Sequence, residues 1–358
     1  MPQSSNKISA WQMYSILILA RIMHTMIYYS GRPGTEMMLT VLLTTLIEIL
    51  VCTPLVCLIT DGGTDIAAEI GGEKGKTAVR LLYAVYFLFI STGTITNYSR
   101  FMNIEFPNVA SVPIIIIVLA AAAGYCAWLG IEGVARACGI VYGVIIAMVI
   151  IMSAVSEGRL ETINLLPITS ESIPNMLEYA AADLSSSWWL PMLASLAPYL
   201  RGGVKKTVTL YLASKLIIIE ALALMLTLML WGFVDIIGYP ILALGAYAKT
   251  DFIQHFDSIN MLVWTLNCVI VNGVYIFISA GTSGGGRKLM PIIASSLAVT
   301  VGALLSYYFR ADYSSHIAFM IKITGIILLG IILPLAALIK RKIRRYMVKC
   351  RENSSLSY

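Results

Sequence analysis

The chain has 358 residues, of which 58% are hydrophobic and only 12% are charged. Soluble globular domains carry about 25% charged residues, so this composition excludes an ordinary soluble protein. The formal net charge of +6 alone would allow a nucleic-acid-binding protein, and the positions of the charges decide against that class.

Ten apolar stretches follow one another along the chain. At about 1.5 Å per residue, each is long enough to cross most of a ~30 Å hydrocarbon core. Lipid offers no hydrogen bonds to the backbone, so each stretch must be a helix. We therefore predict an all-α, polytopic membrane protein with a single transmembrane domain over residues 1–340 and a basic tail over 341–358. The ten predicted helices are 11–29, 37–59, 79–99, 112–130, 138–155, 180–200, 208–233, 258–280, 291–308 and 317–339.

The basic residues predict the orientation of these helices. If the N-terminus is cytoplasmic, 17 of the 25 Lys and Arg residues lie in cytoplasmic segments and five lie in outer loops. This bias fits the positive-inside rule with both termini in the cytoplasm. Seven of the 17 stand between Lys340 and Arg351. A basic segment next to a membrane helix contacts anionic headgroups, so we expect membrane lipids, and not nucleic acid, as its partners.

Polar residues inside the spans are candidates for function, because a charge near the bilayer centre costs at least a few kcal/mol. Arg21 and His24 share one face of the first span, and Thr25 follows one turn after Arg21. They form either the polar wall of a buried cavity or a structural ion pair, for instance Arg21 with Glu48 of the second span. Glu48 and Glu220, deep in the second and seventh spans, belong either to a proton relay or to structural ion pairs.

The sixth span is irregular. Pro191 removes a backbone donor and clashes with the carbonyl of Ser187, and the serines just before it offer groups that satisfy the freed backbone. In transporters built from inverted repeats, such a broken helix marks the substrate site near the membrane midplane. The alternative is a simple kink. Thr94 and Asn97 at the end of the third span either line a pocket or help helices to pack.

No catalytic motif such as G-x-S-x-G or H-E-x-x-H occurs, and the six cysteines form no C-x-x-C pair. The sequence therefore predicts no enzyme, no metal site and no cofactor. The candidate substrate-binding residues are Met23, His24, Thr25, Thr94, Asn97, Ser185, Ser186, Ser187 and Pro191. The candidates for ion or proton coupling are Arg21, Glu48 and Glu220.

Five short patches carry a family resemblance. They are Lys7–Gln12, Gly75-Lys76, Gly130–Arg136, Ile163–Pro167, and His255–Ser258 with Trp264. In this order, across almost the whole chain, they resemble the endospore germination permease family, the B subunits of nutrient germinant receptors, within the amino acid–polyamine–organocation superfamily. The chain departs from the family at Met23-His24-Thr25, where members commonly have a Gly-x-Gly-like break. It also lacks an acidic residue around Leu190–Met192, where members often carry one.

The resemblance implies a LeuT-like fold, in which helices 1–5 and 6–10 are inverted repeats and helices 1 and 6 flank a central site. It implies recognition of a small nutrient germinant, such as an amino acid, in the inner spore membrane or the cell membrane. The partners would be the A subunit and the lipoprotein C subunit of a receptor. Three hypotheses remain, because a fold does not settle function: a sensing receptor subunit, a proton- or cation-coupled amino acid permease, and a scaffolding subunit with a vestigial cavity.

Overall fold

The computed structural model describes residues 7–27, 35–105, 110–155, 160–165, 173–230, 244, 256–281, 289–313 and 315–355. Three residues of the family patches, Leu166, Pro167 and His255, lie outside the described residues, as do the ends of the predicted spans 11–29 and 208–233. The same holds for five of the basic residues counted above, namely Arg32, Arg159, Lys249, Arg287 and Lys288.

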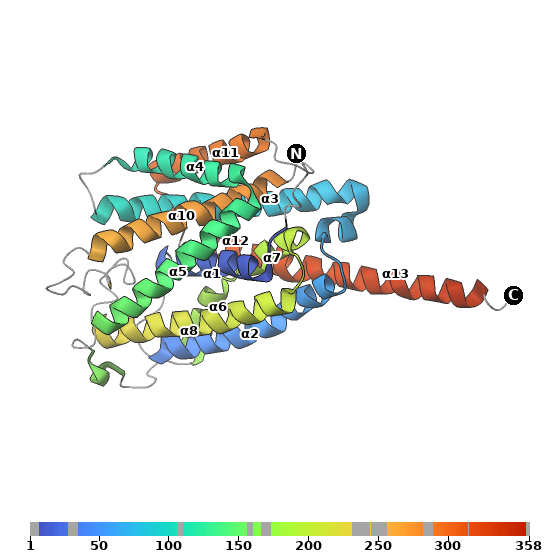
Figure 1. Ribbon diagram of the computed structural model, residues 1–358, viewed down its shortest axis with the longest axis horizontal. Helices are drawn as coiled ribbons and strands as arrows, with labels where there is room; N and C mark the ends of the chain where they lie inside the picture. The colour runs from blue at the N-terminus through green and yellow to red at the C-terminus, as the bar shows by residue number, and fades with distance from the viewer. Residues whose placement is uncertain are drawn as a thin grey trace.

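The described chain is a bundle of helices (Figure 1). Its elements in order are α1 Ala10–Ile27, α2 Thr35–Thr60, α3 Ile66–Glu105, α4 Val112–Leu129, α5 Ile131–Val155, η2 Thr162–Leu165, α6 Ile173–Leu184, α7 Trp189–Leu196, η3 Ala197–Tyr199, α8 Val204–Leu230, α10 Phe256–Ala280, α11 Leu289–Tyr308, α12 His316–Gly325, η5 Ile326–Ile332 and α13 Leu333–Ser355. The only β-structure among the described residues is an isolated parallel bridge between Ile8 and Leu200.

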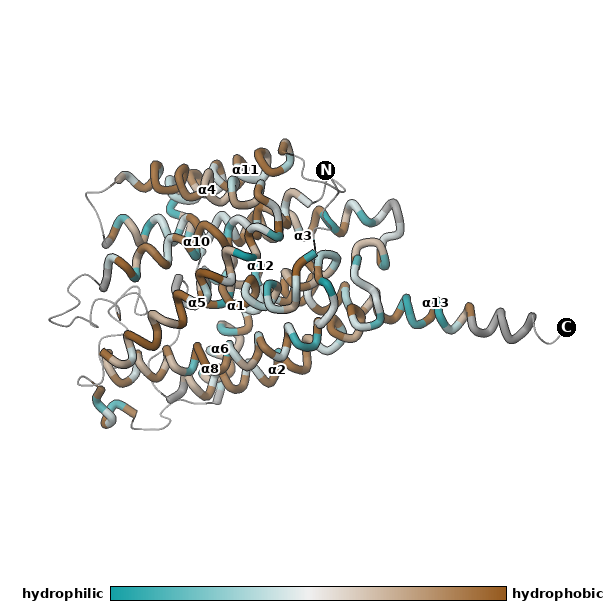
Figure 2. Tube along the Cα trace, viewed as in Figure 1, coloured by the Kyte–Doolittle hydropathy of each residue, from teal (hydrophilic) through white to brown (hydrophobic). Residues whose placement is uncertain are grey.

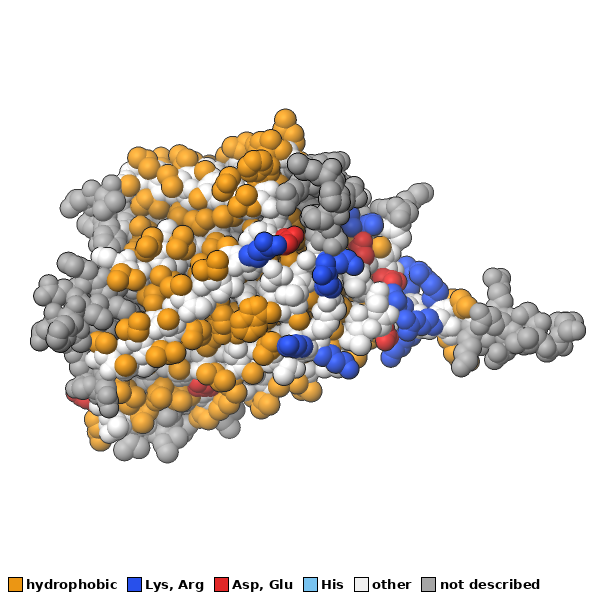
Figure 3. Space-filling model, viewed as in Figure 1, with side chains coloured by type: hydrophobic (Ala, Val, Ile, Leu, Met, Phe, Trp, Pro, Cys, Tyr) orange, Lys and Arg blue, Asp and Glu red, His pale blue; other side chains and the backbone are white. Residues whose placement is uncertain are grey.

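Eight helices of the described part are long and apolar enough to cross a membrane. They are Met37–Thr60, Gly75–Ile104, Val112–Leu129, Ile131–Val155, Val204–Leu230, Ser258–Ala280, Leu289–Tyr308 and His316–Val348. The bundle is predominantly hydrophobic along its length (Figure 2), and its sides are covered with apolar side chains (Figure 3). Leu50, Ile140 and Ile317 are all at least 70% exposed, as expected where lipid is the solvent. The protein is therefore an all-α, polytopic integral membrane protein.

The first predicted span is the central helix α1. It packs against α5, α8 and α10 and lies inside the bundle (Figure 1). Every side chain from Met13 to Thr25 is buried. Because α1 faces protein rather than lipid, it tolerates polar residues that a peripheral span would exclude.

The start of α1 is fixed to the far end of the sixth predicted span. Ser9 and Gln12 form a capping box, in which the Ser9 N–H donates to Gln12 Oε1 at 2.9 Å and the Gln12 N–H donates to Ser9 Oγ at 3.2 Å. The N–H of the preceding Ile8 donates to the Tyr199 carbonyl at 2.8 Å, and its carbonyl accepts from the Arg201 N–H at 2.9 Å. These two bonds join the entry of α1 to the segment that follows η3.

The tenth predicted span is a continuous helical rod formed by α12, the π-helix η5 and α13. It meets α7 at Gly330, where a Cβ atom would lie 2.9 Å from the Leu190 Cβ and 3.2 Å from the Pro191 Cδ. A side chain at this position would collide with the start of α7. The rod continues beyond residue 340 without a break, so the predicted basic tail is part of α13 through Ser355.

We predict that Gly330→Ala destabilises the protein by about 1–3 kcal/mol, because the added methyl group overpacks the contact with α7. The matched control is Gly143→Ala in α5, where an added Cβ meets nothing within 4 Å. Unfolding of both purified variants in the same detergent measures the difference. Equal stability of the two variants would contradict the close contact.

Candidate functional site

The sixth predicted span is a broken helix. α6 ends at Leu184 and α7 begins at Trp189. Between them the chain forms turns, with the Ser187 N–H donating to the Leu184 carbonyl at 2.9 Å and the Leu190 N–H donating to the Ser187 carbonyl at 3.1 Å. Pro191 therefore stands in the first turn of α7, where its missing N–H leaves no carbonyl without a donor.

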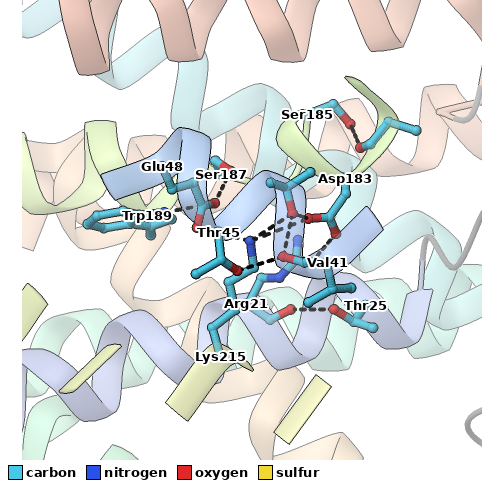
Figure 4. Close-up of polar contacts among 12 residues, drawn as sticks. Arg21, Thr25, Val41, Thr45, Glu48, Asp183, Ser185, Ser187, Trp189 and Lys215 are labelled. Carbon is cyan, nitrogen blue, oxygen red and sulfur yellow. Dashed lines mark hydrogen bonds and ion pairs between the residues drawn. The ribbon is translucent and has the colours of Figure 1, made fainter. Parts of the chain in front are cut away.

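Four charged side chains meet at this break, two of them cationic and two anionic. We call Arg21, Glu48, Asp183 and Lys215 the charge cluster; they come from α1, α2, α6 and α8 (Figure 4). The side chains of Arg21, Glu48 and Lys215 are at most 2% exposed, and that of Asp183 is 15% exposed. Opposite charges must compensate one another here, since desolvation costs several kcal/mol per ion.

Asp183 uses its two carboxylate oxygens differently. Oδ1 accepts from Nη2 of Arg21 in an ion pair. Oδ2 accepts from Thr44 Oγ1 at 2.6 Å and lies 3.3 Å from Lys215 Nζ. If the first interaction is released, the second still holds the carboxylate in place.

Glu48 connects Lys215 to the break. Its Oε2 is 2.9 Å from Lys215 Nζ. Its Oε1 accepts from the Ser187 hydroxyl and, at 3.2 Å, from the Trp189 Nε1–H. One carboxylate thus holds both the break and the first residue of α7 against α2.

The charges also match the two helix ends that the break creates. Carbonyl groups give the C-terminal end of α6 a partial negative charge, and N–H groups give the N-terminal end of α7 a partial positive charge. The cations Arg21 and Lys215 pair with Asp183 in the last turn of α6, and the anion Glu48 meets the first turn of α7. Each helix end therefore faces charge of the opposite sign.

Aromatic rings enclose the cluster. His24 of α1 packs edge-on against Trp188 of the break, with ring centroids 4.4 Å apart, and Trp188 in turn contacts Tyr275 of α10. The Tyr211 ring of α8 lies 4.4 Å from the Trp189 ring. These rings keep water away from the charges and strengthen their interaction.

Two buried polar groups at this place have atoms with no hydrogen-bond partner among the described residues. Arg21 donates from Nη2 to Asp183, but its Nε and Nη1 have no hydrogen-bond partner among the described residues. The Tyr211 hydroxyl has no such partner either. Tyr211 lies within electrostatic reach of Arg21. A buried donor without a partner costs about 1–3 kcal/mol, so these atoms are poised to accept a ligand that supplies oxygen acceptors.

The structure places the predicted site residues in three groups. Arg21, Glu48, His24 and Ser187 lie at the break as described. The second group donates hydrogen bonds from its hydroxyls to backbone carbonyls, at 3.1 Å for Thr25, 2.8 Å for Thr94 and 2.6 Å for Ser185. The Sδ atom of Met23 accepts a hydrogen bond from Asn267 Nδ2 at 3.7 Å. Asn97 and Ser186 are buried, and Pro191 packs against Gly330.

The suggested pairing of Arg21 with Glu48 is wrong, since Arg21 pairs with Asp183 and Glu48 pairs with Lys215. Asp183 and Lys215 are the two members of the cluster that the candidate site residues did not include. The signal for Asp183 was a carboxylate two residues before the Ser-Ser-Ser run that precedes the proline. Glu220 makes none of the ion pairs of the charge cluster, and both of its carboxylate oxygens lack a hydrogen-bond partner in the described part of the chain.

An interior broken helix with charged side chains at its centre is typical of transporter-like membrane proteins. A family model of spore germination proteins matches residues 7–317. The chain belongs to this family. No curated protein matches the chain. Among the described residues, no group of three or more His, Cys, Asp or Glu could hold a metal ion.

We predict that Lys215→Met lowers the free energy of unfolding by about 3–5 kcal/mol, because it leaves the buried Glu48 without its cation and removes one of the two cations beside Asp183. The double variant Lys215→Met/Glu48→Gln should recover part of this loss. Lys205→Met, at an exposed position of the same helix, is the control. Unfolding in detergent provides the measurement, and an effect of Lys215→Met no larger than that of Lys205→Met would contradict a stabilising cluster.

Proposed function

We propose that this spore germination family member is a receptor subunit that recognises a small zwitterionic nutrient, an amino acid, at the charge cluster. The observation that supports it best is the Arg21–Asp183 ion pair at the helix break, together with the unpartnered nitrogens of Arg21. In this proposal the ligand carboxylate binds Arg21 and the Tyr211 hydroxyl. The ligand ammonium group binds the Asp183 oxygen that Arg21 releases.

Charge balance favours this ligand class. The cluster holds two positive and two negative groups, so a ligand with a net charge would leave one buried charge uncompensated. A zwitterion inserted between Arg21 and Asp183 keeps the sum at zero and replaces one ion pair with two. Asp183 is the most exposed of the four, and Lys215 and Thr44 still hold its second oxygen.

The same insertion offers a signal. Separating Arg21 from Asp183 changes the distance between α1 and the end of α6, and a ligand that prefers the separated form shifts the protein toward it. In the proposed setting, a LeuT-like 5+5 arrangement in the inner spore membrane with both termini cytoplasmic, the A and C subunits of a germinant receptor would respond to that shift. The gathering of basic side chains at the end of the bundle from which α13 leaves supports this orientation (Figure 3).

Ligand binding raises the melting temperature of the protein by mass action, which gives a direct test. Among small molecules screened against purified protein, we expect zwitterionic amino acids to raise it. The matching amine that lacks the carboxylate, and the matching acid that lacks the ammonium group, should change the melting temperature little. Arg21→Lys should weaken binding by about 100-fold, because a point charge replaces the planar fork. The exposed Arg136→Lys should bind normally, as a control. If the amine without a carboxylate raised the melting temperature as much as the amino acid does, recognition of a carboxylate at Arg21 would be refuted.

Glu220 favours a second candidate function, an amino acid permease coupled to protons. A carboxyl group in a span whose oxygens are buried and unpartnered is the type of group that takes up and releases protons in transporters. In this case, proteoliposomes should accumulate labelled amino acid when an inward proton gradient is imposed, and Glu220→Gln should abolish accumulation but not binding. Binding without uptake in the unmodified protein favours the receptor function.

A further inference from the structure

The last part of α13 projects from the bundle, and none of the described residues covers it between Lys342 and Val348. All side chains from Lys342 to Val348 are exposed, and the helix continues to Ser355. These residues extend for about 21 Å at 1.5 Å per residue. Figure 1 shows them continuing the direction of the spans, away from the bundle.

An isolated helix of this length is only marginally stable in water, and this one carries an apolar stripe. Ile343, Tyr346 and Met347 are 53%, 72% and 59% exposed. Their spacing of three and four residues places them on one face. Ile339, 50% exposed, extends the same face toward the membrane. The stripe is the surface that a partner helix would cover.

The flanks of the stripe define the chemistry of that partner. The segment from Lys340 to Arg351 contains seven basic and no acidic residues. Arg341 pairs with Glu69. Arg344 also reaches Glu69, at 3.9 Å, but its side chain remains 61% exposed, and Lys342 is exposed as well. A second copy of this chain would place like charges against each other, which is unfavourable. A bilayer surface is perpendicular to the spans, whereas the projecting helix runs parallel to them. The stripe therefore does not lie flat on the bilayer.

We propose that the exposed face of α13, defined by Ile343, Tyr346 and Met347 with Lys342 and Arg344 beside them, binds an acidic amphipathic helix of a partner protein. The pairing is of the helix-against-helix kind, with apolar anchors at the centre and opposite charges at the edges. It is independent of the ligand proposed for the charge cluster.

The base of α13 is hydrogen-bonded to the bundle, so a movement of the projecting helix is transmitted to other helices. The Asp61 carbonyl in the α2–α3 turn accepts from Arg341 Nη2 at 2.7 Å and from Arg345 Nη2 at 2.9 Å. Gly62 follows with a φ of +83°, a conformation that allows this turn, and a Cβ there would lie 3.2 Å from Arg341 Nη2. A partner that pulls or tilts α13 therefore moves the turn between α2 and α3.

The test places the photo-crosslinking residue p-benzoylphenylalanine at Met347 of the full-length protein in its native membrane. Ile217, an apolar position of α8 that is 68% exposed, is the control. We expect Met347 to give a protein adduct whose linked peptide, identified by mass spectrometry, is an acidic amphipathic helix. We expect the control to give only lipid adducts.

Charge reversal provides the second readout. Lys342→Glu with Arg344→Glu should reduce the Met347 adduct by about tenfold or more, because like charges then face each other. Lys205→Glu with Lys206→Glu, a basic pair at exposed positions of α8, should leave it unchanged. A lipid adduct at Met347, a dimer of this chain, no adduct, or an adduct insensitive to the charge reversal would each overturn the proposal.

Discussion

The compensation of four ionised groups inside an apolar bundle constrains the rest of the structure. None of the four could stay charged alone away from water, because desolvation would cost several kcal/mol. Together, Arg21, Asp183, Lys215 and Glu48 form a chain of alternating charge. Each belongs to a different helix, so this requirement fixes α1, α2, α6 and α8 relative to one another. It also explains why α6 stops where it does, since continuation of the helix would carry Ser187 and Trp189 away from Glu48.

The continuous first helix changes how this member of the family can bind a ligand. α1 is helical from Ala10 to Ile27, so the backbone N–H groups of Met23, His24 and Thr25 are used within the helix and offer nothing to a ligand. A glycine break would have exposed such groups. In the proposed recognition, side chains bind the ligand, and Arg21 would supply the charge that an unwound backbone supplies as a dipole.

The sequence was sufficient to predict what depends on one segment at a time. Apolar length predicted the eight helices of the described part that are long and apolar enough to cross a membrane, and Pro191 after three serines predicted the break. The family patches mark joints that the structure explains, such as the Ser9–Gln12 capping box and the bond from Asn164 Nδ2 to the Leu228 carbonyl at 3.2 Å. The partner of Arg21 could not be predicted, because Asp183 and Glu48 were both available and only the packing of α6 beside α1 decides between them. For the same reason, hydropathy could not show that α1 is the interior helix.

Two separate connections lead from the charge cluster to the end of the bundle that carries α13. The first is α1, which begins at the Ile8–Leu200 bridge and contains Arg21. The second is α2, which contains Glu48 and ends at the turn where Asp61 accepts from Arg341 and Arg345. Buried cores shift between discrete arrangements rather than deform continuously. A rearrangement of Asp183 between these two helices would therefore move the Ile8 bridge and the base of α13 together, whereas a change confined to one helix would leave the other joint in place. Correlated movement at the two joints is thus the signature that separates a signalling subunit from a bundle in which the cluster serves only stability.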